Sequence, residues 1–165
     1  MTLCQTIAID YEDEMKNTRK LLERVPLDDA HRNYKPHAKS MSLEALASHV
    51  AEIPSWTPIV FAGPVFELDV NHKQEIARTT EDLLKTFDKG VEQMREAIVN
   101  ATDAEMNKDW TFKYGEMAMT SPRTKVVRSF IDHLIHHRAQ LGVYLRLNNV
   151  AIPGMYGPSA DEMPM

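Results

Sequence analysis

The sequence contains a single cysteine, Cys4, among 165 residues. One thiol cannot form an internal disulfide, which is typical of proteins in a reducing compartment. No apolar run approaches the ~20 residues that a membrane span requires. The first residues, MTLCQTIAIDYEDEM, also lack the basic and apolar regions of a secretory signal. We therefore expect a cytoplasmic protein that does not enter a membrane.

The sequence also has no excess of basic residues over acidic ones. The formal net charge is −5, and charged residues make up 26% of the chain. Proteins that bind nucleic acid usually carry a basic patch or stripe, so nucleic acid is not an expected partner. Hydrophobic residues make up 43% of the chain, as in ordinary folded domains. Because this length is enough to bury a core, we expect one domain over residues 1–165.

Strand signals are scarce, whereas apolar residues recur at spacings of three and four in four segments. The ranges that this periodicity predicts as helical are about 5–25, 42–53, 80–101 and 122–148. Ser42 is a suitable N-cap, and Pro26 and Pro54 stop the first two helices. Gly90 lies inside the third helix, at a cost of about 1 kcal/mol relative to alanine.

The connections between these helices are long. We expect IVFAGPVFELDV to be irregular, with at most a short edge pairing, because it contains proline and glycine. A small hairpin is an option near Trp110 and Tyr114. Four amphipathic helices with such connections predict an all-α fold, a four-helix bundle.

The last predicted helix, within FIDHLIHHRAQLGVYLRLNN, carries three histidines in five residues. At about 100° per residue, His137 lies about 40° from His133, and both border the apolar stripe. His136 lies at about 300° and leans toward solvent. The spacing of His133 and His137 places two imidazoles on one face, where they can hold one cation.

A ligand from a facing helix would complete such a site, and His49 borders the apolar stripe of the second predicted helix. One histidine of this kind is more often a core-edge residue bonded to the backbone. Three on two helices favour a metal site, so the predicted ligands are His49, His133 and His137. The remaining histidines, His31, His37 and His72, are expected in loops or on the surface.

Polar and aromatic residues near these ligands have both a functional and an ordinary interpretation. Gln140 could anchor a ligand water, Tyr144 could donate to a substrate, and Glu52 could orient a ligand or act as a base. Each is more often a plain surface or core-edge residue. Trp56 is expected to pack at the mouth of a cavity. Cys4 is a weak candidate nucleophile, because it has no partner nearby in the sequence.

Two longer segments, YKPHAKSMSLEALASHVAEIPSW and HLIHHRAQLGVYLRLNNVAIPGMYGPSADE, together carry a family resemblance. The sequence resembles the DinB-like proteins, a damage-inducible family of metal-binding four-helix bundles, over nearly the whole chain. The closing block of that family reads H-x-x-H-H-R-G-Q-L, then Y-L-R, then P and YG. Ala139 stands where glycine is frequent. The resemblance implies metal ligands at His49, His133 and His137, the residues that the helical positions also select.

Three protein ligands leave one metal position open for water or substrate. Imidazoles suit zinc, nickel, iron or copper, and the resemblance favours zinc or nickel. The open position permits hydrolysis by a bound water or activation of an external thiol.

Relatives of the DinB-like type include thiol-dependent transferases and a thiol-dependent isomerase. The resemblance therefore implies transfer of a low-molecular-weight thiol to a small electrophile. The alternatives are a metal-dependent hydrolase and a non-catalytic metal-binding stress-response protein. A homodimer stays open, because such relatives often pair through bundle faces.

Overall fold

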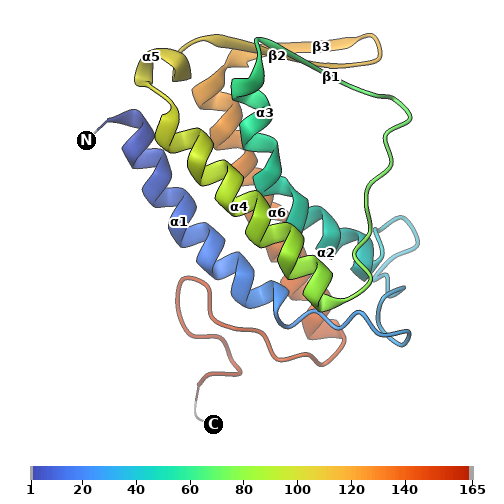
Figure 1. Cartoon of the computed structure of the whole chain (residues 1–165). Coiled ribbons are helices and arrows are strands. Elements are labelled where there is room, and N and C mark those ends of the chain that lie inside the picture. Colours follow the sequence, from blue (N-terminus) through green and yellow to red (C-terminus); the bar gives the residue numbers. More distant parts are fainter. Residues whose placement is uncertain (1, 164–165) are drawn as a thin grey trace.

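The structure, a computed structural model of the chain, describes residues 2–163. Four helical segments lie side by side, and one of them is a composite of three short helices (Figure 1). The long helices are α1 (Leu3–Leu22), α4 (Thr80–Asn100) and α6 (Arg123–Leu147). The composite consists of α2 (Leu43–Glu52), η1 (Ile53–Trp56) and α3 (Thr57–Ala62). A single turn, α5 (Asp103–Met106), follows α4.

Side-chain caps fix the starts of α1, α2 and α4 close to the predicted positions. Ser42 accepts a hydrogen bond from the Ala45 backbone N–H, so the predicted cap of α2 is confirmed. Thr79 caps α4 in the same way. Helix α1 ends at Leu22, before the predicted boundary, although Val25 is still buried in the core.

The composite segment corrects the prediction for the connection after α2. Pro54 ends the α-helical hydrogen bonding of α2, as expected, but the chain stays helical through η1 and α3 to Ala62. Proline is compatible with this because it occupies the first turn of each new helix, where its missing N–H has no partner to lose. The first four residues of IVFAGPVFELDV are therefore helical rather than irregular.

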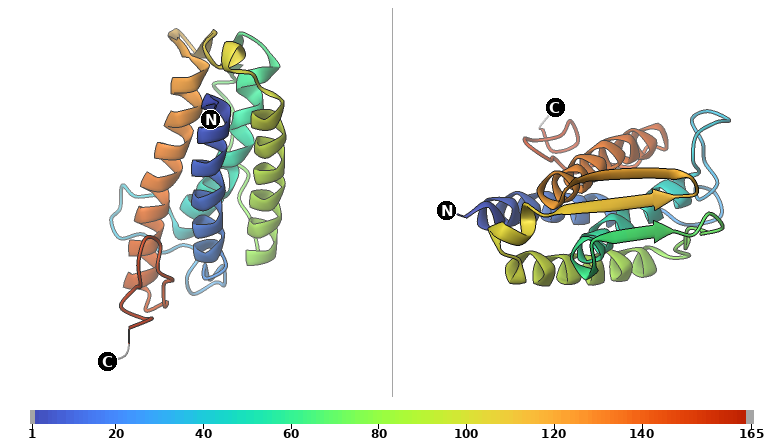
Figure 2. Two further views of the ribbon diagram at one scale, coloured as in Figure 1. Left: turned by 90° about the vertical axis from the view of Figure 1, so that its left-hand side faces the viewer. Right: turned by 90° about the horizontal axis from the view of Figure 1, so that it is seen from above.

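A three-stranded sheet lies across one end of the helices (Figures 1 and 2). Its strands are β1 (Val65–Leu68), β2 (Asp109–Tyr114) and β3 (Met117–Pro122), in the order β1-β2-β3. Strands β2 and β3 form an antiparallel hairpin, whereas β1 pairs with β2 in parallel. The prediction of an all-α four-helix bundle is therefore wrong, because the fold combines helices with a mixed sheet.

Burial of aromatic side chains explains why the sheet forms. Trp110 and Phe112 on β2 alternate with Thr111 and Lys113, and Trp110 is buried against the helices. The hairpin at these residues was an option in the sequence. The sequence left a short edge pairing open for this segment. The partner strand β2, which sets Phe66 opposite Phe112, was not predicted, since four residues are too few to show a period of two.

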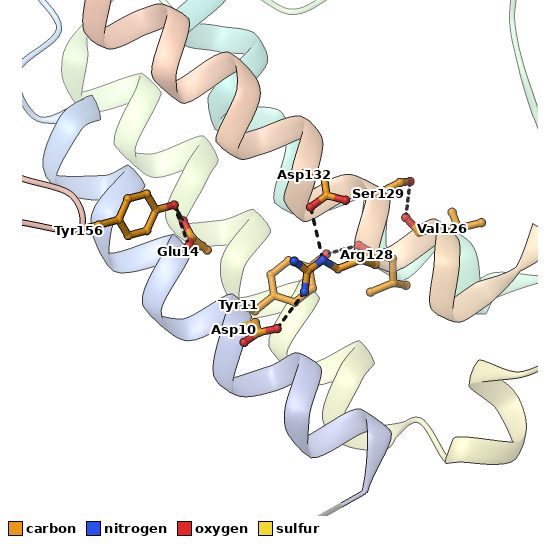
Figure 3. Close-up of polar contacts among 9 residues, drawn as sticks. Asp10, Tyr11, Glu14, Val126, Arg128, Ser129, Asp132 and Tyr156 are labelled. Atoms are coloured by element: carbon orange, nitrogen blue, oxygen red, sulfur yellow. Dashed lines mark hydrogen bonds and ion pairs between the residues drawn. The ribbon is translucent and has the colours of Figure 1, made fainter.

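The irregular segment 148–163 folds back on the seam between α1 and α6. Tyr156 donates from its hydroxyl group to the Glu14 carboxylate on α1 (Figure 3). Further along the same seam, Arg128 on α6 lies between Asp10 of α1 and Asp132 of α6 (Figure 3). These contacts join α6 to α1 on the face away from α2. Within residues 2–163 no helix is long and apolar enough to cross a membrane.

Helix α4 packs very closely on η1, and Gly90 is the residue that permits it. A Cβ atom at this position would lie 3.1 Å from the backbone nitrogen of Ser55 and 3.3 Å from Cβ of Pro54. Both atoms belong to a rigid part of the chain. The glycine therefore serves helix packing, which the helical pattern alone did not reveal.

We predict that Gly90→Ala lowers the free energy of unfolding by about 1–3 kcal/mol, because overpacking outweighs the roughly 1 kcal/mol gained in helix propensity. The matched control is Gly142→Ala in α6, where a new Cβ meets nothing within 4 Å; it should raise stability by about 0.5–1 kcal/mol. Urea denaturation of the three proteins measures both effects. Equal stabilisation by the two substitutions would contradict the packing argument.

Candidate metal centre

Helices α2 and α6 pack together and bring three histidines to one place. His49 lies on α2, and His133 and His137 lie one turn apart on α6. The Nε2 atoms of His49 and His133 are 2.9 Å apart. The ring centroids of His137 lie 4.7 Å from His49 and 4.5 Å from His133. One ligand nitrogen from each of the three lies within 4.8 Å of the others, so the group could hold a metal ion.

Hydrogen bonds at the opposite ring nitrogens orient two of the imidazoles. Nδ1 of His49 is 2.7 Å from a carboxylate oxygen of Glu52. Nδ1 of His137 is 2.7 Å from the side-chain oxygen of Gln140. An oxygen of either kind accepts a hydrogen bond, so in the neutral ring Nδ1 is the donor and Nε2 keeps its lone pair. This arrangement is the usual support of a metal-binding histidine.

Burial and neighbouring rings disfavour the charged forms of His133 and His137. Burial, followed by the neighbouring His137, His49 and His136, lowers the pKa of His133 from 6.5 to about 4. Burial also lowers the pKa of His137, while its hydrogen bond to Gln140 acts in the opposite direction. Neutral imidazole is the form that binds metals, so no proton has to be displaced from His133 at neutral pH.

An aromatic wall, formed by Trp56 and Phe130, borders the group on one side. The Trp56 ring lies 5.4 Å from His49 and 5.5 Å from His133, measured between centroids. Phe130 packs edge-on against Trp56 at 5.6 Å. Both side chains are only partly buried. Trp56 was expected at a cavity mouth, and in the structure it contacts two of the three histidines.

The other histidines lie apart from this group. His136 is exposed and lies beside His137, with 4.9 Å between ring centroids. His31, His37 and His72 lie in the connecting segments, as expected, and His31 pairs with Asp28 there.

Further candidates from the sequence have structural roles. Tyr144 is buried, and its hydroxyl donates to the Met41 carbonyl rather than reaching the histidines. Gln140 bonds to His137, so it orients a ring instead of anchoring a ligand water. Burial, together with Asp103, raises the pKa of the Cys4 thiol. That residue lies at the start of α1 and is a poor nucleophile.

Arg138 was missed by the sequence analysis. It is 3% exposed and follows His137 on α6 but points to the opposite side of the helix, toward α1. Its guanidinium lies 2.6 Å from the Glu14 carboxylate and also donates to Thr18 and to the Tyr156 hydroxyl. A buried charge needs such partners. The pair fixes the rotation of α6, and the only signal for it was a charged residue at a core position of the helical wheel.

The donor set fits a transition-metal ion. Three neutral imidazoles suit zinc, nickel, iron or copper, and they leave a position for a further ligand. Glu52 and Gln140 occupy the nitrogens that face away from the group, which adds the orienting partners that such ligands normally have.

Comparison with known proteins agrees with this fold. The sequence model described as the DinB family matches residues 5–164. The chain therefore belongs to the DinB family. Two similar solved structures are DinB-like proteins from Bacillus cereus and Bacillus subtilis. The first has 18% sequence identity and a TM-score of 0.71, and the alignment covers 92% of this chain and 97% of that one.

The Bacillus subtilis protein has 20% identity and a TM-score of 0.69, and the coverage is 93% of this chain and 99% of that one. At such identities the likeness concerns the fold. Among curated proteins, none matches this sequence.

The lowered pKa of His133 predicts how the metal-free protein responds to acid. The unfolded chain binds a proton at His133 more tightly than the folded chain does. The free energy of unfolding should therefore fall as pH drops from 6.5 to about 4. Urea denaturation with a chelator present, at pH ~7 and ~4.5, measures this loss.

The His133→Asn variant is the control for this acid effect. It should lose less stability over the same pH range, because asparagine does not titrate. An identical loss in both proteins would show that other groups cause the acid sensitivity.

Proposed function

We propose that His49, His133 and His137 hold one divalent metal ion, zinc or nickel, and that the protein transfers a low-molecular-weight thiol to a small electrophile. The observation that carries the proposal is the convergence of three imidazoles, two of which, His49 and His137, have their outer nitrogens already occupied. Three protein ligands, rather than four, are typical of catalytic sites. A thiol cosubstrate also fits the cytoplasmic location that we propose for this chain.

A divalent ion at this site would lower the pKa of a coordinated thiol below its free value of ~8.5 and so favour the nucleophilic thiolate. The thiol proton goes to solvent. The sulfur then forms a bond to the electrophilic carbon, and a leaving group departs with its electron pair. With a conjugated carbonyl compound, the electron pair of the double bond moves to the neighbouring carbon, which takes up a proton from water.

The residues of the chain contribute orientation rather than proton transfer. Glu52 and Gln140 hold the rings of His49 and His137 so that each Nε2 faces the common centre. The Trp56 ring covers one side of His49 and His133 and reduces the access of water there.

The same contacts argue against the rival hydrolase. Hydrolysis requires a base near the metal-bound water, and Glu52 and Tyr144 are the candidates from the sequence. Glu52 lies at the Nδ1 edge of His49, away from the side where Nε2 converges with the other histidines. The Tyr144 hydroxyl donates to the Met41 carbonyl. A thiolate needs no such base, so this arrangement favours transfer of a thiol.

The ligand assignment predicts how metal content responds to substitution. Alanine at His49, His133 or His137 should each lower zinc affinity by at least about tenfold, because every ligand contributes a bond. His136→Ala is the matched control, since it removes a neighbouring imidazole outside the group. Zinc titration against a competing chelator measures all four variants. Loss of zinc in His136→Ala, with retention in His137→Ala, would overturn the assignment.

The proposed thiol chemistry can be tested with cobalt in place of the native metal. Addition of low-molecular-weight biological thiols to the cobalt-loaded protein should produce intense thiolate-to-cobalt charge-transfer bands in the near ultraviolet for at least one thiol. The bands should be absent in His133→Ala. A cobalt-loaded protein that shows no such band with any thiol of the panel would exclude the transferase proposal.

A further inference from the structure

The electrophile must reach the thiolate sulfur closely, at about 3–3.5 Å between the reacting atoms. It therefore has to lie against the side chains that border the three histidines. Those side chains differ in the surface that they present to an electrophile. Glu52 and Gln140 are already bonded to ring nitrogens, and His136 lies on the solvent side of His137.

The aromatic wall of Trp56 and Phe130 offers a different kind of surface. Trp56 contacts His49 and His133, and Phe130 extends this aromatic surface along α6. Neither ring is fully buried. Trp56 is held in place because it ends η1, whose backbone is packed tightly against Gly90 of α4. The wall is thus a rigid, partly open apolar surface beside the histidines.

The net charge beside the three histidines also limits which electrophiles can bind. Among residues 2–163, Glu52 is the charged side chain in hydrogen-bond contact with the histidines. A divalent ion, one thiolate and the Glu52 carboxylate together carry no net charge. No arginine or lysine of the described chain pairs with these histidines or with Glu52 to attract an anion. An electrophile bearing a carboxylate would therefore gain little and would meet the negative charge of Glu52.

We infer that the aromatic wall selects the acceptor, and that the acceptor is a neutral aromatic electrophile, such as an aryl-substituted conjugated ketone. This inference rests on the proposed thiol transfer for its chemistry. Offset or edge-on contact between the aryl group and Trp56 supplies the affinity. The recognition itself needs no thiol, so it can be measured without turnover.

Binding can be followed at the indole N–H of Trp56 by two-dimensional nuclear magnetic resonance. The chain contains two tryptophans, and Trp110, buried in the sheet at 4% exposure, is an internal control. Trp56→Phe assigns the two signals. The probes are benzylideneacetone and ethylideneacetone, which share one enone and differ only in phenyl against methyl. Each is added to the zinc-loaded protein with no thiol present.

We expect benzylideneacetone to shift the Trp56 signal and to bind at least about tenfold more tightly than ethylideneacetone, because the phenyl ring buries additional apolar area. The Trp110 signal should stay in place. Benzylidenepyruvate carries a carboxylate in place of the methyl group of the ketone. It is compared with benzylideneacetone on the metal-free protein, because zinc without its thiolate would itself attract the carboxylate, and it should bind more weakly there. Equal affinity for the two enones, or tightest binding of the carboxylate, would overturn the inference.

Substitutions in the aromatic wall distinguish its contribution to binding from that of the metal ligands. Trp56→Ala and Phe130→Ala should each reduce the preference for the phenyl probe, while zinc still binds at one ion per chain. Binding to these variants is measured from the proton NMR signals of the probe. Trp56→Leu keeps an apolar side chain there in case Trp56→Ala does not fold, and it should also lose the preference. A preference that survives all three substitutions would refute the role of the wall.

Failure of this inference can be distinguished from failure of the proposed thiol transfer. Aryl-selective binding without any thiolate band on cobalt would leave the wall as a binding site and remove the transferase. Thiolate bands without aryl selectivity would keep the transferase and remove the wall as the selector.

Discussion

Three imidazoles can share one small volume only while they carry no charge. Two protonated rings at the centroid distances of about 4.5–5.1 Å observed here would repel each other and would also lose hydration. The lowered pKa values of His133 and His137 express this constraint. Their surroundings meet it in a consistent way, since Nδ1 of His49 donates to Glu52 and Nδ1 of His137 donates to Gln140, which leaves the Nε2 lone pairs of these two rings free for a metal ion. The proposed metal site depends on this arrangement of neutral rings.

Such an arrangement requires α6 to keep one rotation, and the opposite side of that helix provides it. Arg138 is buried in a network with Glu14, Thr18 and Tyr156, on the side facing α1. A rotation of α6 would separate this buried charge from its partners, which is strongly unfavourable. His137 and Arg138 are adjacent in sequence, so fixing one residue also fixes the other. The α1 face of α6 thus stabilises the geometry of its α2 face.

The helical wheel predicted the three converging histidines and the exposure of His136, because side-chain direction on a long helix follows directly from residue number. The same reasoning placed α1, α4 and α6 within a few residues. It could not predict contacts that depend on a partner distant in sequence. The parallel pairing of β1 with β2, the packing of Gly90 on η1 and the burial of Arg138 are all of this kind. The all-α prediction was wrong because it treated the hairpin of β2 and β3 only as an option, and because β1 is too short to show its own period.

The sheet also changes the effective distance along the chain between the histidines. His49 and His133 are 84 residues apart in sequence, and closing a loop of that length has a substantial entropic cost. Strand β1 directly follows the composite that begins with His49's helix, and β3 runs directly into α6. Once the strands pair, the path from His49 to His133 is much shorter. It runs through the composite, across the sheet and along the first turns of α6. Sheet formation therefore raises the effective concentration of His49 near His133 and His137, before any ion is bound.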